Sequence, residues 1–168
     1  GDNGILDFHL SGGIYDGDPM TLDRVRTADT GLGGVDTIRG DAEDDVILGG
    51  SAGDFIYGSA GNDLVLGDFG EVRFGSVSVT KLGVTTSYKE YALYATTTDR
   101  SQGGADTIFG NEDEDVIAGG AYGDNLDGGL GDDLVFGDNV TLDRTGGRMN
   151  DFTNPRFRAA TGTLYDAN

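Results

Sequence analysis

Glycine and aspartate recur at a nine-residue spacing over residues 31–66. The stretch divides into four consecutive units, GLGGVDTIR, GDAEDDVIL, GGSAGDFIY and GSAGNDLVL, and each unit opens with glycine. Every unit has Asp at its sixth position and an aliphatic residue at its eighth, and the same arrangement returns over residues 101–136. A fixed short period predicts one small structural unit per repeat, stacked on its neighbours. The sixth positions of the two stretches are Asp36, Asp45, Asp54, Asp63, Asp106, Asp115, Asp124 and Asp133.

Each nonapeptide has six turn-forming residues followed by a three-residue tail, which predicts one turn and one short strand. Two units would then close one coil of eighteen residues. Side chains alternate in direction along a strand, so the aliphatic eighth position points one way and the seventh and ninth positions point the other way. We therefore expect the eighth positions to stack inside a roll.

Residues eighteen apart should lie above one another, about 4.8 Å apart along the stack. Stacked carboxylates repel one another unless a cation lies between them, and Ca²⁺ accepts six to eight oxygen ligands with loose geometry. Aspartates that only cap turns are the alternative, but an Asp in phase in every unit argues against it. We expect at least four calcium ions, bound between the turns of the pairs Asp36/Asp54, Asp45/Asp63, Asp106/Asp124 and Asp115/Asp133.

These nonapeptides resemble the RTX (repeats-in-toxin, hemolysin-type) calcium-binding family. The resemblance implies an all-β fold, a right-handed parallel β-roll (β-solenoid), in two short blocks separated by β-rich or irregular excursions. It also implies that Asp side chains and turn carbonyls of adjacent coils share Ca²⁺. Proteins of this family generally leave the cell by type I secretion, which uses a C-terminal signal, so an extracellular or cell-surface location is implied.

Some positions depart from the family pattern. Asp41 and Asn111 occupy second positions, and Glu43 and Asp113 occupy fourth positions, where the family prefers glycine. These four polar residues would either add calcium ligands or distort the turns of Asp45 and Asp115. After each block the sixth position is aliphatic, which predicts that the roll stops after two coils per block, with no full site above Asp54 or Asp124.

The chain contains a large internal duplication. Residues 33–69 and 103–139 align without gaps, with 20 of 37 positions identical. We divide the chain into the tail of a preceding block (1–8), an excursion (9–30), a first block (31–74), a β-rich excursion (75–100), a second block (101–144) and a last excursion (145–168).

One outward face of the roll is unusually apolar. A sheet with two apolar faces is normally covered on both, so we expect the excursions to fold over this face as strands, with Val77, Val79, Tyr91 and Leu93 in contact. The alternative is self-association, in which a neighbouring copy covers it. The outward apolar residues are Val46, Leu48, Leu64, Leu66, Val116, Leu134 and Phe136.

Charge and composition narrow the possible functions. The formal net charge of −19 excludes binding to nucleic acid by phosphate attraction, and no apolar run is long enough to insert in a membrane. The chain has no cysteine, so calcium would take the place of disulfides. His9 is the single histidine and cannot form a His-Glu-x-x-His zinc motif; we therefore expect no enzyme activity.

Three functions remain. The leading one is a calcium-binding structural segment of a large secreted or cell-surface protein, such as an adhesin, a surface-layer protein or a filament subunit. The alternative is the calcium-binding C-terminal region of a type I-secreted enzyme or toxin. Ice binding would need an outward ladder of Thr and Asn, which the seventh and ninth positions do not provide.

Overall fold

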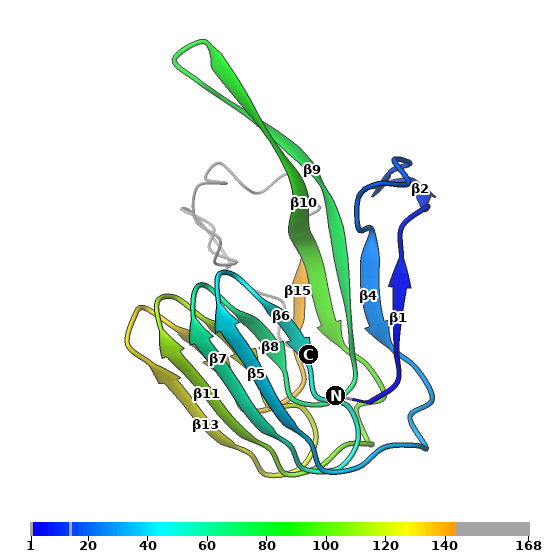
Figure 1. The fold of residues 1–168 in the computed structure, drawn as a ribbon, viewed down its shortest axis with the longest axis vertical. Coiled ribbons are helices and arrows are strands. Elements are labelled where there is room, and N and C mark those ends of the chain that lie inside the picture. The colour runs from blue at the N-terminus through cyan, green and yellow to red at the C-terminus, as the bar shows by residue number, and fades with distance from the viewer. Residues whose placement is uncertain (1, 14, 144–168) are drawn as a thin grey trace.

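The computed structural model describes residues 2–13 and 15–143, apart from the side chains of residues 16, 77–81 and 86–91. Within these ranges every helix or strand element is a β-strand, which confirms the expected all-β class (Figure 1). No helix in this part of the chain is long and apolar enough to cross a membrane. The expected last excursion, 145–168, lies outside the described residues.

The nonapeptides form two parallel four-stranded sheets, which together we call the repeat body. The long-strand sheet contains β5 (Thr37–Ala42), β7 (Phe55–Ala60), β11 (Thr107–Glu112) and β13 (Asn125–Gly129). The short-strand sheet contains β6 (Val46–Leu48), β8 (Leu64–Leu66), β12 (Val116–Ala118) and β14 (Leu134–Phe136). Successive repeat strands alternate between the two sheets, which is consistent with a β-roll.

The eighth positions fill the space between these two sheets, as the alternation of side chains requires. Ile56, Val65, Ile108 and Ile117 are all fully buried and form one cluster with Ile47. Parallel pairing in register places Ile56 beside Ile108, and Val65 beside Ile117. At the β14 end of the stack the equivalent side chain, Val135, is 44% exposed because no further described strand packs over it.

The expectation that the stack ends after two coils in each block is wrong. β7 pairs directly with β11, and β8 pairs directly with β12, so the four coils form one continuous stack. The chain leaves the stack after Asp68 and returns at Gly103, and Gly67 N–H donates to Ala118 O (2.8 Å) across this junction. The residues between therefore interrupt a single turn without interrupting the stack of coils.

The excursions form a third, antiparallel sheet, which we call the covering sheet. Its order is β1 (Gly4–Asp7), β4 (Arg24–Thr27), β9 (Gly70–Lys81), β10 (Val84–Thr97) and β15 (Thr141–Asp143). The β9–β10 hairpin extends well beyond the rest of the molecule (Figure 1). A small pair, β2 (Ser11–Gly12) and β3 (Tyr15–Asp16), follows β1. β9 and β15 begin inside the ranges that the repeat spacing assigned to the two blocks.

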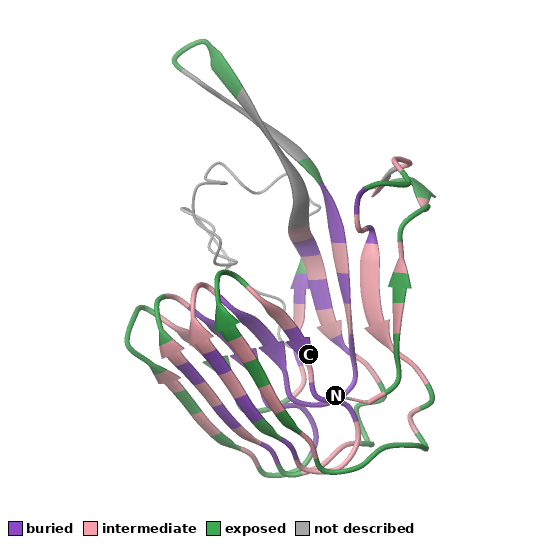
Figure 2. Cartoon of the chain, in the orientation of Figure 1, coloured by how far each residue is buried: buried purple, intermediate pink, exposed green. Residues whose placement is uncertain are grey.

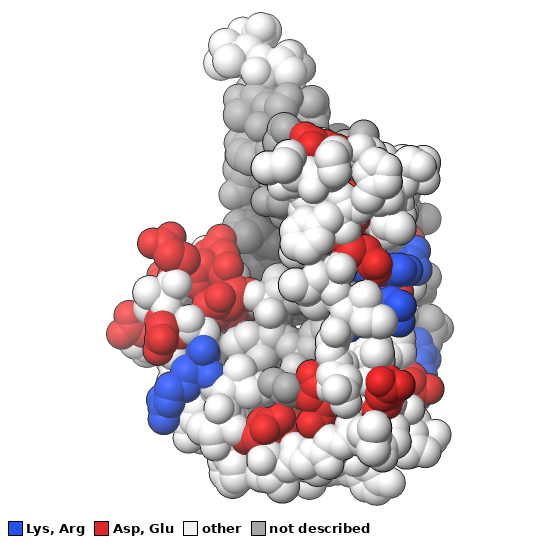
Figure 3. Space-filling model, turned by 45° about the vertical axis from the view of Figure 1, so that its right-hand side comes forward, with Lys and Arg blue, Asp and Glu red and all other residues white. Residues whose placement is uncertain are grey.

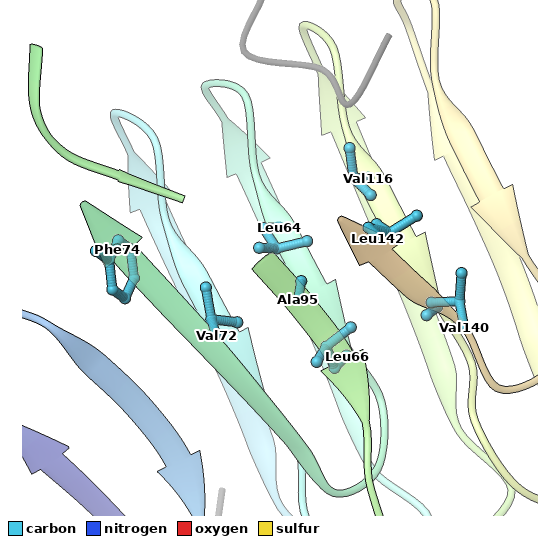
Figure 4. Packing of buried hydrophobic residues seen from close by; sticks show 9 residues of the cluster. Leu64, Leu66, Val72, Phe74, Ala95, Val116, Val140 and Leu142 are labelled. Carbon is cyan, nitrogen blue, oxygen red and sulfur yellow. The ribbon is translucent and has the colours of Figure 1, made fainter. Parts of the chain in front are cut away.

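The covering sheet packs on the apolar outer face of the short-strand sheet, as expected. Leu64 and Leu66 of β8 lie under Val72 of β9 and Ala95 of β10, and all four are buried (Figures 2 and 4). Each fully buried aliphatic or aromatic side chain contributes about 1.5–3 kcal/mol, so this contact is a large part of the stability of the fold. Self-association is not needed to cover the face.

Of the four residues expected to make this contact, Leu93 is the one whose side chain the structure describes. Leu93 is buried, whereas the side chains of residues 77, 79 and 91 are outside the described set. The contact is made nearer the base of the hairpin, because only there does the hairpin lie over the short strands. The buried residues of the covering sheet and its approaches that share one apolar cluster with the short strands are Val72, Phe74, Ala95, Val140 and Leu142.

Candidate metal centre

The eight aspartates at the sixth positions form two ladders, one along each edge of the repeat body. In the first ladder Asp36 N–H donates to Asp54 Oδ1 (2.8 Å), and Asp106 N–H donates to Asp124 Oδ1 (3.0 Å). In the second ladder Asp45 N–H donates to Asp63 Oδ1 (2.9 Å), and Asp115 N–H donates to Asp133 Oδ1 (3.0 Å). The structure therefore brings together every pair that the eighteen-residue spacing predicted.

Two further pairs cross the junction between the duplicated stretches. Asp54 N–H donates to Asp106 Oδ1 (2.8 Å), and Asp63 N–H donates to Asp115 Oδ1 (2.9 Å). A further coil with a ladder aspartate, Asp106, therefore does follow above Asp54. The eighteen-residue spacing could not predict these two pairs. Their members are 52 residues apart in sequence, because the inserted strands lie between two coils that are adjacent in space.

The second carboxylate oxygen of most of these aspartates is buried without a partner. Burying a charged oxygen in this way is costly unless a cation or donor compensates it. The unpartnered atoms are the Oδ2 atoms of Asp45, Asp54, Asp63, Asp106, Asp115 and Asp124. Six orphaned oxygens at equivalent positions indicate a repeated site for a ligand that accepts their lone pairs.

Each orphaned oxygen faces a glycine five residues earlier in its own unit, or Gly67 across the interrupted turn for Asp106, and a glycine carbonyl of the next coil. A Cβ atom placed on Gly40 would stand 2.5 Å from Asp45 Oδ2 and 2.5 Å from Gly58 O. A side chain at this position would fill the space between the two oxygens, which explains the glycine there. The equivalent space recurs at Gly49, Gly58, Gly67, Gly110 and Gly119.

Carboxylate and carbonyl oxygens in this arrangement suit Ca²⁺ better than a transition metal. Among the described residues, no group of three or more His, Asp or Glu side chains converges in a way that could hold a metal ion. A complete calcium ligand set would therefore need backbone carbonyls in addition to the two aspartates of a pair. The residues present fit calcium, because the orphaned Oδ2 atoms and glycine carbonyls lie together at each junction.

Burial strongly perturbs these carboxyl groups in the metal-free chain. The pKa of Asp106 is raised to about 8, chiefly by loss of solvent and in addition by the nearby charges of Asp68, Asp124 and Asp54, against the lowering effect of the hydrogen bond with Asp54 N–H. Burial likewise raises the pKa of Asp115 to about 7, and those of Asp54 and Asp63 to about 6. At neutral pH the ladders thus hold buried charges that favour either a proton or a cation.

The acidic departures from the glycine pattern do not disrupt the turns. Asp41, Glu43, Asn111 and Asp113 adopt positive φ angles of 77°, 74°, 85° and 71°. These angles lie near the left-handed region that Asp and Asn tolerate best after glycine. The Asp45 and Asp115 ladder is continuous across them.

Two functional aspartates were missed because they lie outside the matched units. Asp68 is 1% exposed, and its carboxylate accepts Gly104 N–H (2.8 Å) and Ala121 N–H. Asp2 holds the equivalent place before the first block, where its carboxylate accepts Gly34 N–H (3.1 Å) and Ser51 N–H (2.6 Å). Each of these carboxylates bridges the point where an excursion interrupts a turn. The recurring dipeptide Gly-Asp at residues 1–2, 67–68 and 137–138 was the available signal.

We expect Asp68→Ala to destabilise the calcium-loaded protein by about 2–4 kcal/mol, because the buried Ala121 N–H and the half-buried Gly104 N–H would lose their acceptor, and each loss costs about 1–3 kcal/mol. Chemical denaturation in saturating calcium measures this. Asp138→Ala is the matched control, since Asp138 holds the same motif position but is exposed, and we expect a change within about 0.5 kcal/mol. Equal effects of the two substitutions would show that the bridge does not join the coils.

Comparison with known families supports the calcium assignment. The family model of the RTX calcium-binding nonapeptide repeat (4 copies) matches the chain over residues 30–65, 101–121 and 109–139. No curated protein and no solved structure matches the chain. The matched residues include all eight predicted aspartates.

Proposed function

Because the chain carries RTX calcium-binding nonapeptide repeats, we propose that it is a calcium-folded structural segment of a larger secreted or cell-surface protein. The observation that carries this proposal is the row of six buried carboxylate oxygens, each facing a glycine carbonyl of the next coil. Bound Ca²⁺ would supply the positive charge that allows these oxygens to be ionised inside the fold.

The proposed ligands are the eight ladder aspartates together with the glycine carbonyls of adjacent coils. The pairs Asp36/Asp54, Asp45/Asp63, Asp106/Asp124 and Asp115/Asp133 give at least four ions. The junction pairs Asp54/Asp106 and Asp63/Asp115 have the same coil-to-coil hydrogen bond, which supports further ions between the duplicated stretches. A right-handed solenoid path for the coils is part of this proposal.

A structural role is favoured over a simple secretion tail because the excursions are integral to the fold. The covering sheet buries its own apolar residues against the short-strand sheet, so each insertion adds stability to the repeat body. A rigid, calcium-stabilised module of this kind suits an adhesin, a surface-layer protein or a filament subunit exported by type I secretion. We propose no catalytic role for it.

The second candidate is the calcium-binding C-terminal region of a secreted enzyme or toxin. The RTX repeats are compatible with it, since the repeats alone do not distinguish a structural protein from an enzyme's tail. A catalytic domain encoded upstream in the complete gene would favour this candidate. A further run of repeat modules would favour the structural one.

Isothermal titration with CaCl₂ at pH 7.5 tests calcium binding directly. We expect at least four ions per chain, one for each predicted pair, and Asp115→Asn should reduce the number bound or weaken binding by about tenfold, since one charged ligand is lost. Asp127→Asn is the control, because Asp127 is an exposed carboxylate of the long-strand sheet. The absence of calcium binding, or equal losses in both variants, would refute the proposal.

A further inference from the structure

None of the described strands packs on the outer face of the long-strand sheet. Among the described residues the covering sheet packs on the short-strand sheet, whereas exposed and half-buried positions alternate with buried ones along the long strands (Figure 2). On this open side Phe55 is 46% exposed, and Tyr57 and Phe109 are half-buried. We infer that this face binds a neutral saccharide at a site formed by Arg39, Phe55, Tyr57, Ser59, Asn111 and Glu112, which we call the sheet-face site. Its residues border Gly40, Gly58 and Gly110 of the proposed calcium sites in sequence, but none of them is itself a proposed calcium ligand.

Three side chains on adjacent strands form a stack across this face. The guanidinium carbon of Arg39 lies 4.4 Å from the centre of the Tyr57 ring, and the Tyr57 and Phe109 rings stack 5.4 Å apart at 13°. Parallel register puts the three residues side by side on β5, β7 and β11. A cation held over an aromatic ring is attracted by its π electrons, so the Arg39 head group is positioned before any ligand arrives.

Arg39 is also the single cation of the repeats. Residues 33–68 and 103–138 contain no other Lys or Arg, and the ion pairs of the described residues all belong to the covering sheet. Figure 3 shows acidic side chains gathered on this part of the surface and few cations among them. An arginine that stacks on a ring without a carboxylate partner has donors available for a ligand.

A shallow depression adjoins this stack. It has a volume of about 290 Å³ and is lined by Arg39, Tyr57, Ser59, Ala60, Asn111 and Glu112. Ser59 adopts a φ of 91° at the second position of its unit. In the preceding unit the second position is Gly50. Glycine would adopt this conformation without strain. Asp41 and Asn111, in register with Ser59 on the neighbouring strands, also have positive φ angles, so a row of polar side chains lines this edge of the sheet.

Phe55 provides an apolar contact next to the depression. Its direct neighbours across the sheet are Thr37 and Thr107, which are too short to cover the ring. Phe55 and Tyr57 point to the same side of β7 and are about 6.6 Å apart along the strand. A ligand lying along β7 would thus meet an exposed ring first and hydrogen-bonding groups next.

Sugar rings match this combination of groups. Their hydroxyls both donate and accept, and the site offers a donor in Arg39, an acceptor in Glu112 and groups of both kinds in Ser59 and Asn111. An apolar ring face packs against the C–H face of a sugar, as in most small-molecule sites, where apolar walls surround a few polar groups.

Arg39 shares this face with the carboxylates of Asp41, Glu112 and Asp127, and these charges together with the net charge of −19 repel polyanions. A protein partner is disfavoured because polar residues such as Thr37, Thr107 and Asn125 divide the apolar surface.

Titration of the calcium-loaded, ¹⁵N-labelled chain with cellohexaose, maltohexaose and chitohexaose tests the inference. We expect at least one of these to shift the amide signals of β7 and β11 saturably and to leave those of β6 and β8 unchanged. Shifts confined to other strands, or no saturable shift with any of the three sugars, would overturn it. Saturable binding of anionic polysaccharides alone would also overturn the assignment of a neutral ligand.

Substitutions then test which side chains contribute to the affinity for the sugar. Calorimetry should show that Phe55→Ala and Arg39→Ala each weaken binding by about tenfold or more, the loss expected for a central contact residue. Tyr122→Ala is the control, because Tyr122 is a 68% exposed aromatic side chain on a different turn, and its affinity should match that of the unmodified chain. Melting temperatures in calcium check that each variant is folded, and unchanged affinity in folded Phe55→Ala would overturn the site.

Discussion

Excess EGTA at pH 8 is expected to abolish most of the β-structure of the chain. Six buried carboxylate oxygens then lack any compensating charge. A ligand present at a thousand times its Kd stabilises a fold by about 4 kcal/mol per site. Several such sites together match or exceed the stability of a typical domain, about 5–15 kcal/mol. Far-ultraviolet circular dichroism with and without chelator measures the change.

The covering sheet should be lost together with the repeat body, because its buried residues pack on the short strands. Adding CaCl₂ back should restore the spectrum, whereas equimolar MgCl₂ should restore it poorly, since Mg²⁺ demands a stricter geometry and keeps its water ligands. A spectrum that excess EGTA leaves unchanged would contradict the coupling of calcium binding and folding.

Acidification is expected to restore folding in the absence of calcium. The folded-state pKa is raised above its ordinary value to about 8 for Asp106, about 7 for Asp115 and about 6 for Asp54, Asp63 and Asp68, with burial as the main cause in each. A carboxyl group with a raised pKa binds more protons in the folded state than in the unfolded state. Folding without calcium is therefore most favourable near pH 4 and weakens as the pH rises through 6 to 8.

Thermal unfolding at pH 4.5, 6 and 8 in EGTA measures this dependence. Each pKa unit corresponds to about 1.4 kcal/mol, so even part of these shifts, summed over several carboxyl groups, decides whether the chain folds. In saturating calcium the dependence between pH 6 and 8 should be much weaker, because the cation replaces the protons. Greater stability at pH 8 than at pH 4.5 in EGTA would show that the ladders are not buried as described.

Asp106→Asn provides an internal check on the same effect. Asparagine resembles a protonated aspartate and carries no charge, so this variant should be more stable than the unmodified chain in EGTA at pH 8. The variant should also be less stabilised by added calcium, because a ligand charge is gone. Asp127→Asn, on the exposed face of β13, should leave both measurements unchanged.

The sequence by itself determined the repeating unit and its chemistry. A nine-residue period with glycine first, aspartate sixth and an aliphatic residue eighth is local information, and each turn and strand follows from the conformational preferences of those residues. Stacking of Asp36 with Asp54 follows as well, because no insertion separates the two coils. The apolar outer face also predicted a cover, since exposed aliphatic side chains on both faces of a sheet are unfavourable.

Only the tertiary structure decided how the interrupted turns close. Asp68 contacts Gly104 and Ala121, which are 36 and 53 residues away, and no local pattern marks contacts at such separations. The aliphatic Val72 at the expected sixth position suggested that the stack had ended, but Val72 belongs to the covering sheet and Asp106 takes its place above Asp54. An insertion whose two ends meet in one turn leaves the coil-to-coil hydrogen bonds intact, and it is these bonds that place residues far apart in sequence into one continuous stack.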